Sequence, residues 1–318
     1  MHKELHSSLE QIRCQVEAQA STPTTESLIN GLSEVCARLE AGEYFGPAAF
    51  GSYYQLVFAL LRQEPELDSF IRDLQSYATP RPAFGIHRFD ADGLGGESVL
   101  DLYRSCFETD PEANYGFLSP RKEDAERCAA SIQRGLDLMT QTAPELAGEV
   151  YSIVHQVLLA SSSGVPGERR FDGASSYMMW GALILNALEE KSDLEMMETL
   201  AHEAGHSLLF GMTIDEPLVL NDESELYASP LRADPRPMDG IYHATFVSAR
   251  MHYSMLRAQR SGLLSADQIT ECESFLAASE KAFDLGLSVV QASGRLSESG
   301  RKIMANAEAF MDSKKLAA

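Results

Sequence analysis

The sequence predicts a protein that is mainly α-helical with a small β-sheet, which places it in the α+β class. Apolar side chains recur three and four residues apart through most of the first 145 residues, the spacing of amphipathic helices. Two apolar runs follow, at 150–160 and 175–187, and both are strand candidates. Helical spacing then returns and continues through the C-terminal third.

Residues 1–147 are expected to form a helical N-terminal region. The stretch 77–96 (YATPRPAFGIHRFDADGLGG) is rich in proline and glycine and is expected to be a loop. Helical patterning resumes near Ala125 and runs through Leu138. The clearest early helix has apolar positions at Leu28, Ile29, Leu32, Val35, Cys36 and Leu39.

Residues 148–318 are expected to form the second region, with the sheet and the C-terminal helices, and the two regions could pack as one compact unit. A helix is predicted from Ser192 to Phe210, because Ser192 and Glu195 have the spacing of a capping box. Gly211 is its predicted C-cap.

The segment after this helix is expected to be irregular, and helix is expected to return near its end. Residues 212–239 combine prolines with many acidic side chains. Helical spacing begins again at Gly240, with breaks near Ser261 and Gly294.

Composition and charge narrow the classes of function. The chain has 318 residues, 44% of them hydrophobic, and a formal net charge of −21. This charge disfavours nucleic acid as a partner, because binding to phosphates gains its affinity from basic side chains. No apolar run reaches the length of a membrane span, and the polar N-terminal residues lack the apolar centre of a secretory signal. We therefore expect a cytoplasmic protein that contacts neither nucleic acid nor membrane.

The cysteines do not predict a disulfide framework. They number five, and no two have CxxC spacing, which also disfavours a thiolate metal site of the usual kind. We expect most of them to be buried small side chains.

One short motif carries metal chemistry. His202, Glu203 and His206 form an HExxH sequence on the predicted helix. Residues four apart share one face of a helix, so both imidazoles can bind a single ion, and neutral imidazole is a good ligand for zinc or iron. A strand followed by this helix, flanked by N- and C-terminal helices, predicts a zincin-like core. In that arrangement the strand at 175–187 is a candidate edge for an extended peptide.

The third ligand separates the classes of HExxH protein. Leu209 stands where the metzincin continuation requires glycine, which excludes that subclass. His243, at the predicted start of the next helix, is a candidate ligand because a rigid helix can aim it at the ion. His252, on the same helix, is expected to be structural. A glutamate-type zinc peptidase would instead use a carboxylate, and those available are Glu216, Glu223 and Glu225.

The segment downstream of the motif resembles a known family. The HExxH sequence is followed by Tyr-Ala-Ser-Pro-Leu-Arg at 227–232, Asp-Pro-Arg-Pro at 234–237 and Gly-Ile-Tyr-His at 240–243. This order resembles that of the HExxH-containing peptide-modification proteins, which are encoded near ribosomally made peptide natural products. The chain departs from the family at Leu231, where the family has tryptophan, and at Ala228, which is inserted before Ser-Pro.

The resemblance implies an oxygen-using iron enzyme rather than a hydrolase. Members of the family bind Fe(II) and 2-oxoglutarate and hydroxylate a side-chain β-carbon of a precursor peptide. By this resemblance, His202, His206 and His243 are the iron ligands. The set differs from the two-histidine, one-carboxylate triad that is usual for such oxygenases.

A 2-oxoglutarate enzyme also needs a cation for the distal carboxylate of its co-substrate. Arg236 and Arg232 precede His243 closely in the sequence, and a guanidinium matches a carboxylate with two parallel hydrogen bonds. Surface pairing with Asp234 and Asp239 is the alternative for these arginines. Tyr227 is a further candidate donor to the same carboxylate.

Glu203 has a different role in each interpretation. In a zinc metallopeptidase, the alternative function, it is the general base that activates metal-bound water. In a hydroxylase it orients a ligand or a water. A third interpretation is a scaffold without catalysis that keeps a structural metal.

Overall fold

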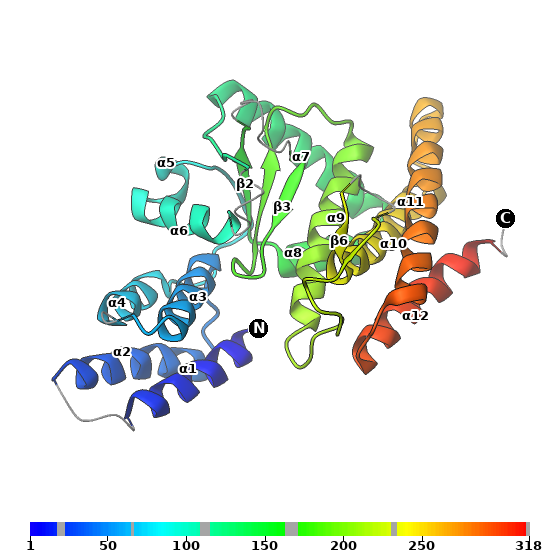
Figure 1. Ribbon diagram of the computed structural model, residues 1–318. Helices are drawn as coiled ribbons and strands as arrows, with labels where there is room; N and C mark the ends of the chain where they lie inside the picture. The colour runs from blue at the N-terminus through cyan, green and yellow to red at the C-terminus, as the bar shows by residue number, and fades with distance from the viewer. Residues whose placement is uncertain (18–22, 65–66, 109–114, 163–170, 230–233, 316–318) are drawn as a thin grey trace. The chain divides into compact units, whose positions relative to one another are not determined.

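The computed structural model describes residues 1–17, 23–64, 67–108, 115–162, 171–229 and 234–315. This part of the chain is mostly helical and contains a four-stranded mixed sheet, as the sequence predicts for an α+β protein (Figure 1). It separates into two compact units. The first unit comprises residues 1–126 and 153–189, and the second comprises 127–152 and 190–318.

The two units interleave along the sequence. The boundary expected between residues 147 and 148 falls inside helix α8 (Pro144–Ile153). Most of α7 (Lys122–Thr142) and nearly all of α8 belong to the second unit, although the helices before them belong to the first. A pattern along the chain does not reveal this exchange, because it depends on which apolar faces meet after folding.

The N-terminal part of the first unit consists of four packed helices. These are α1 (His2–Glu17), α2 (Pro23–Glu40), α3 (Pro47–Leu61) and α4 (Leu67–Tyr77), with α1 against α2 and α3 against α4. Their apolar stripes meet in one core, in which Leu9, Leu32, Leu56 and Leu74 are fully buried. The helical spacing of the sequence predicts this core.

The sheet of the first unit has the strand order β1-β2-β4-β3. Strands β1 (Gly85–Arg88), β2 (Gln156–Ala160) and β4 (Ala182–Asn186) run parallel, and β3 (Gly173–Ser175) is antiparallel to β4. Every residue of β4 is buried. Because β4 pairs with a strand on each side, it is not an edge, and the prediction that this run offers an edge to a peptide is wrong.

The predictions for the loop 77–96 and for the strand 150–160 need correction. The expected loop 77–96 contains β1 and the short helix α5 (Ala91–Leu94), which is capped by the Asp90 side chain accepting from Gly93 N at 2.8 Å. Only the last five residues of the predicted strand 150–160 are extended, because α8 continues to Ile153. A short apolar run does not distinguish the end of a buried helix from a buried strand.

The strand predicted at 175–187 is likewise shorter than expected. Residues 177–180 form a turn, and Gly181 adopts a φ of +93°, a conformation that favours glycine. The backbone amides of His155 and Gln156 donate to the Gly181 carbonyl at 2.7 and 2.9 Å, which sets the register of β2 against β4. Helix α6 (Glu97–Phe107) packs against α3 and α5.

The second unit is built on long helices. Helix α10 (Met238–Arg260) packs against α9 (Asp193–Met212) and α11 (Ala266–Ser293), and α12 (Glu298–Lys315) also contacts α10 (Figure 1). The predicted helix breaks near Ser261 and Gly294 are confirmed, since these residues are the C-caps of α10 and α11.

Two helix ends in this unit differ from the prediction. Helix α9 continues through Gly211 and ends at Met212, with Thr213 as its C-cap. Helix α10 begins at Met238, two residues earlier than expected, directly after strand β6 (Arg236–Pro237). Strand β6 pairs with β5 (Leu226–Tyr227), so the segment expected to be irregular contains a small hairpin.

No helix among the described residues combines the length and apolarity that crossing a membrane requires.

Candidate metal centre

Helix α9 carries the HExxH motif, and its first turn explains why it forms. The Ser192 hydroxyl accepts a hydrogen bond from Glu195 N at 3.0 Å, which satisfies one of the free amides of that turn. In place of the second hydrogen bond of the predicted capping box, the Glu195 side chain forms an ion pair with Lys191 at 3.3 Å. Ser192 is therefore an N-cap, as predicted, and α9 holds the motif on a regular helix.

Gly205 brings the motif helix close to α10. A Cβ atom at this position would lie 3.1 Å from Val247 Cγ1 and 3.5 Å from Arg250 Cγ. A larger side chain at position 205 would therefore have no room, because α10 occupies that space. The close approach places side chains of α10 beside the two histidines of α9.

The two motif histidines meet as the helical spacing predicts. The Nε2 atoms of His202 and His206 are 3.1 Å apart. Two nitrogens that bind one ion at about 2.0–2.1 Å lie about 2.9–3.4 Å from each other, depending on the coordination angle. The separation of this pair therefore suits two ligands of a single metal ion.

His243 joins the pair from α10. Its Nδ1 atom is 3.2 Å from Nδ1 of His206, and the two rings stack with their centroids 5.4 Å apart. The side chain is buried, and this burial lowers the pKa of His243, against an opposing effect from Asp239. The imidazole is therefore neutral at neutral pH, which is the form that binds a metal ion.

His206 stands between the other two histidines with one ring nitrogen toward each. An ion would need one nitrogen from each ring, so the His206 or His243 ring would have to turn about its Cβ–Cγ bond to bind together with the other two. The donor set is three imidazoles, and neutral imidazole suits zinc, iron or copper. The residue types present therefore suit a metal centre, but within the described residues the three rings do not direct one nitrogen each to a common point as they stand.

Met251 is a contact of the centre that sequence reasoning missed. Its Sδ atom lies 3.2 Å from Nδ1 of His202. A thioether accepts hydrogen bonds weakly, so it favours the tautomer with the proton on Nδ1 and leaves Nε2 to face His206. Met251 follows His243 by eight residues on α10, and this spacing along one helix face was the available signal.

Two glutamates of α9 are buried near the motif. Glu203 is 6% exposed, and its Oε1 atom lies 4.0 Å from Nε2 of His202. Glu198, one turn before His202, is also buried, and burial raises its pKa to about 7, with a smaller contribution from Glu195. Sequence reasoning identified Glu203 and missed Glu198, since its position on the helix face carries no motif.

Two of the three carboxylates proposed as alternative third ligands, Glu216 and Glu225, have other partners. Glu216 Oε1 accepts from the backbone amide of Ser299 at 2.8 Å. Glu225 pairs with Arg295 through both carboxylate oxygens, and this pairing lowers the pKa of Glu225 to about 2. Glu223 is exposed. Of the candidate third ligands, His243 is the one that contacts a motif histidine.

The candidate co-substrate residues lie on the hairpin before α10. Tyr227 and Arg236 are directly opposite each other in the β5–β6 register, so their side chains share one face. The Tyr227 hydroxyl accepts from Asn221 at 2.7 Å and donates to Glu225 at 2.5 Å. Arg236 pairs with Asp234 at 3.4 Å, as its surface alternative predicts. Arg232 lies outside the described residues.

Comparisons of the chain with models of known protein families and with curated proteins find no match. The resemblance to the HExxH-containing peptide-modification proteins, based on the motif and the segment after it, stays a prediction.

Proposed function

We propose that this protein is a metal-dependent enzyme with His202, His206 and His243 as its protein ligands. The observation that carries the proposal is the position of His206, with ring nitrogens 3.1 Å from His202 and 3.2 Å from His243. The packing of α9 against α10 does not by itself require three imidazoles side by side. A bound metal ion would require all three. The proposal includes a zincin-like core around α9.

The reaction that we propose is Fe(II)- and 2-oxoglutarate-dependent hydroxylation of a side-chain β-carbon in a ribosomally made precursor peptide. With His202, His206 and His243 as the protein ligands, an iron ion would keep room for the keto acid and oxygen. Bound iron supplies the activation of oxygen that drives decarboxylation of the co-substrate. The third histidine and the Asp-Pro-Arg-Pro segment before it favour this reaction over hydrolysis.

The residues of this chain would orient the reactants. Arg236 offers a guanidinium on the strand that leads directly into α10, close in sequence to His243. Its Nε atom is buried and lies 3.4 Å from Asp234 Oδ2, but it makes no hydrogen bond within the described residues. A carboxylate at this guanidinium would supply a bidentate partner, in competition with Asp234. Arg236 would thereby hold the distal carboxylate of 2-oxoglutarate.

A second candidate function is a zinc metallopeptidase, and the position of Glu203 favours it. The carboxylate is 4.0 Å from the metal-facing nitrogen of His202, from which it can reach a water on the ion. In a hydroxylase the same carboxylate holds a ligand or a water in place. The two functions therefore differ in the need for a base at this position.

One experiment separates these functions. The protein is purified anaerobically and incubated with Fe(II), 2-oxoglutarate and a precursor peptide encoded near its gene, and oxygen is then admitted. Hydroxylation adds a single oxygen atom to the peptide mass and forms succinate. A variant with His206→Ala is the control, because it keeps the helix and removes the central ligand.

Each of the three possible outcomes supports a different function. A peptide that gains one oxygen atom, with succinate and only in the presence of His206, supports the hydroxylase. Peptide fragments that form with zinc and without 2-oxoglutarate would overturn it in favour of the peptidase. An unchanged peptide under both conditions contradicts both catalytic functions and leaves a metal-binding scaffold.

A further inference from the structure

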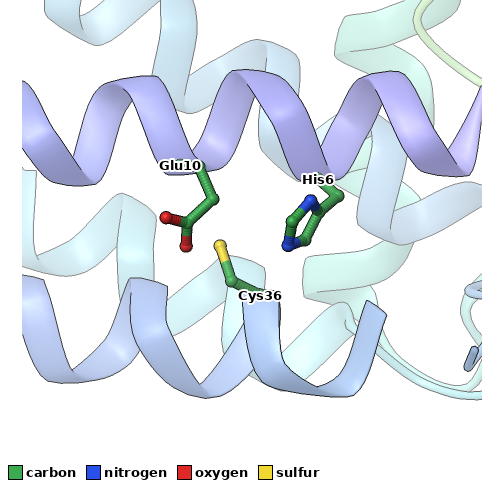
Figure 2. Close-up of side chains that lie close together, drawn as sticks. All are labelled: His6, Glu10 and Cys36. Atoms are coloured by element: carbon green, nitrogen blue, oxygen red, sulfur yellow. The ribbon is translucent and has the colours of Figure 1, made fainter. Parts of the chain in front are cut away.

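A second group of metal-ligating side chains lies in the first unit, between α1 and α2. His6 and Glu10 project from α1, and Cys36 projects from α2 toward them (Figure 2). One ligand atom of each residue, a ring nitrogen, a carboxylate oxygen and the sulfur, lies within 4.8 Å of the other two. Nitrogen, oxygen and sulfur donors thus converge on one point between two helices.

The packing of the two helices produces this convergence. His6 and Glu10 are four residues apart and share one face of α1. Beside them, Leu5 and Leu9 bury their side chains in the core that α1 forms with α2. This apolar contact fixes the distance between the helices, and Cys36 is 3% exposed within it. The three donors are therefore held by a rigid scaffold.

His6 provides an independent sign that the group is incomplete. Its Nε2 atom is buried and has no hydrogen-bond partner within the described part of the chain. Glu40 Oε1 lies 3.6 Å from this nitrogen. Buried ring nitrogens are normally satisfied, so a nitrogen without a bond calls for a partner such as an ion. Glu40 follows Cys36 by four residues on α2 and can supply a fourth ligand.

Arg13 is the charged neighbour that an ion at this point would face. It donates to both oxygens of Glu10, at 3.1 and 2.7 Å, and this pairing, with a hydrogen bond to Cys36, lowers the pKa of Glu10. The carboxylate is therefore ionised, and its two oxygens have lone pairs for more than one partner. Arg13 also pairs with Glu17, which can hold it when Glu10 turns to an ion.

We propose that His6, Glu10 and Cys36 bind a zinc ion that joins α1 to α2, with Glu40 or water as the fourth ligand. Thiolate, imidazole and carboxylate together are a ligand set that zinc accepts in tetrahedral geometry. The ion would stabilise the contact between the two helices. The site is separate from the three histidines of the second unit, so the proposal is independent of the proposed function.

Metal binding at this site has to displace a proton. Burial, with a hydrogen bond to Glu10, raises the pKa of Cys36 to about 12, so the thiol is protonated at neutral pH without a metal. Zinc binds the thiolate, and the proton of Cys36 passes to solvent as the zinc–sulfur bond forms. When this proton leaves, the chain gains one negative charge, on the Cys36 sulfur.

Cobalt(II) is the probe for this site, because it replaces zinc and shows a near-ultraviolet charge-transfer band only with a thiolate ligand. Full-length protein is titrated with cobalt(II) to two equivalents. We expect a thiolate band that Cys36→Ser abolishes and that Cys14→Ser, at an exposed cysteine on α1, leaves unchanged. We also expect His6→Ala to weaken zinc binding at this site at least about tenfold.

A band that is absent from the wild-type protein, or that persists in Cys36→Ser, would overturn the proposal. Far-ultraviolet circular dichroism shows whether Cys36→Ser keeps its fold. If that variant unfolds, His6→Ala decides the result, since His6 is only half-buried and its loss leaves the core intact. A cobalt band in His6→Ala of unchanged intensity and affinity would then contradict the site.

Discussion

The Nδ1 atoms of His206 and His243 lie 3.2 Å apart, although 37 residues separate the two histidines in the sequence. The contact joins α9 to α10 and converts a two-histidine motif into a group of three. Two other side chains of these helices lie near His202. Met251 orients its ring, and Glu203 approaches it. The predictions that follow test what each of these residues does.

Glu203 distinguishes the two catalytic functions. We expect Glu203→Gln to retain bound metal and to lower hydroxylation no more than about 100-fold, because a hydroxylase needs the side chain only for positioning. A general base contributes about 10²–10⁴-fold, so a loss well beyond about 100-fold contradicts a role for Glu203 in positioning alone. The measurement is kcat of the variant and of wild-type protein at saturating 2-oxoglutarate.

Arg236 and Arg232 are the two candidates for the co-substrate carboxylate. We expect Arg236→Gln to raise the KM for 2-oxoglutarate at least about tenfold with a smaller change in kcat, since one charge-assisted bidentate contact is lost. Arg232→Gln is the matched control. If Arg232→Gln raises this KM and Arg236→Gln does not, the assignment passes to Arg232.

Glu198 makes stability depend on pH. Its pKa is raised in the folded protein to about 7, from an ordinary value near 4.5, so folding favours the protonated form. The contribution is complete below pH 4.5 and is lost as pH rises to about 7, a change on the order of 3 kcal/mol. Glu198→Gln should therefore raise the Tm at pH 8 and leave it unchanged at pH 4.5.

The exposed Glu123 on α7 provides the control for this pH dependence. Glu123→Gln should leave the pH profile of the Tm close to that of wild-type protein. A Glu198→Gln variant that is less stable than wild-type protein at pH 8 would show that the folded state uses the ionised carboxylate.

Gly205 sets the distance between α9 and α10. We expect Gly205→Leu to lower the free energy of unfolding by about 1–3 kcal/mol and to weaken metal binding, because the new side chain meets Val247. Gly148→Leu is the matched control, since a Cβ at this exposed helical position meets nothing within 4 Å. That variant should gain up to about 1 kcal/mol from helix propensity. Equal stability of the two variants would contradict close packing at Gly205.

Much of the helical architecture follows from the sequence, because helical spacing and caps are local properties. Ser192 marks the start of α9, and Ser261 and Gly294 mark the ends of α10 and α11. Strand β1 was missed because it is four residues long, half-buried and set among prolines. Its extended form depends on pairing with β2, which no local pattern reveals.

The candidate metal centre is predictable in part for the same reason. His202 and His206 follow from one motif on one helix, whereas the contact with His243 depends on the packing of α10 at Gly205. The group in the first unit shows this limit more clearly. His6 and Glu10 have visible helical spacing, but Cys36 joins them only through the packing of α2 on α1.

The central claim is that three histidines bind one metal ion, and X-ray absorption spectroscopy tests it most directly. The spectrum is recorded on iron(II)-loaded protein with Cys36→Ser, which removes the proposed zinc site. We predict scattering from three imidazoles in this protein, and from two when His243→Ala is added. The control is His252→Gln, which removes a buried hydrogen bond to Ser279 and should leave three imidazoles at the metal. Two imidazoles in the parent protein, unchanged by His243→Ala, would contradict the claim.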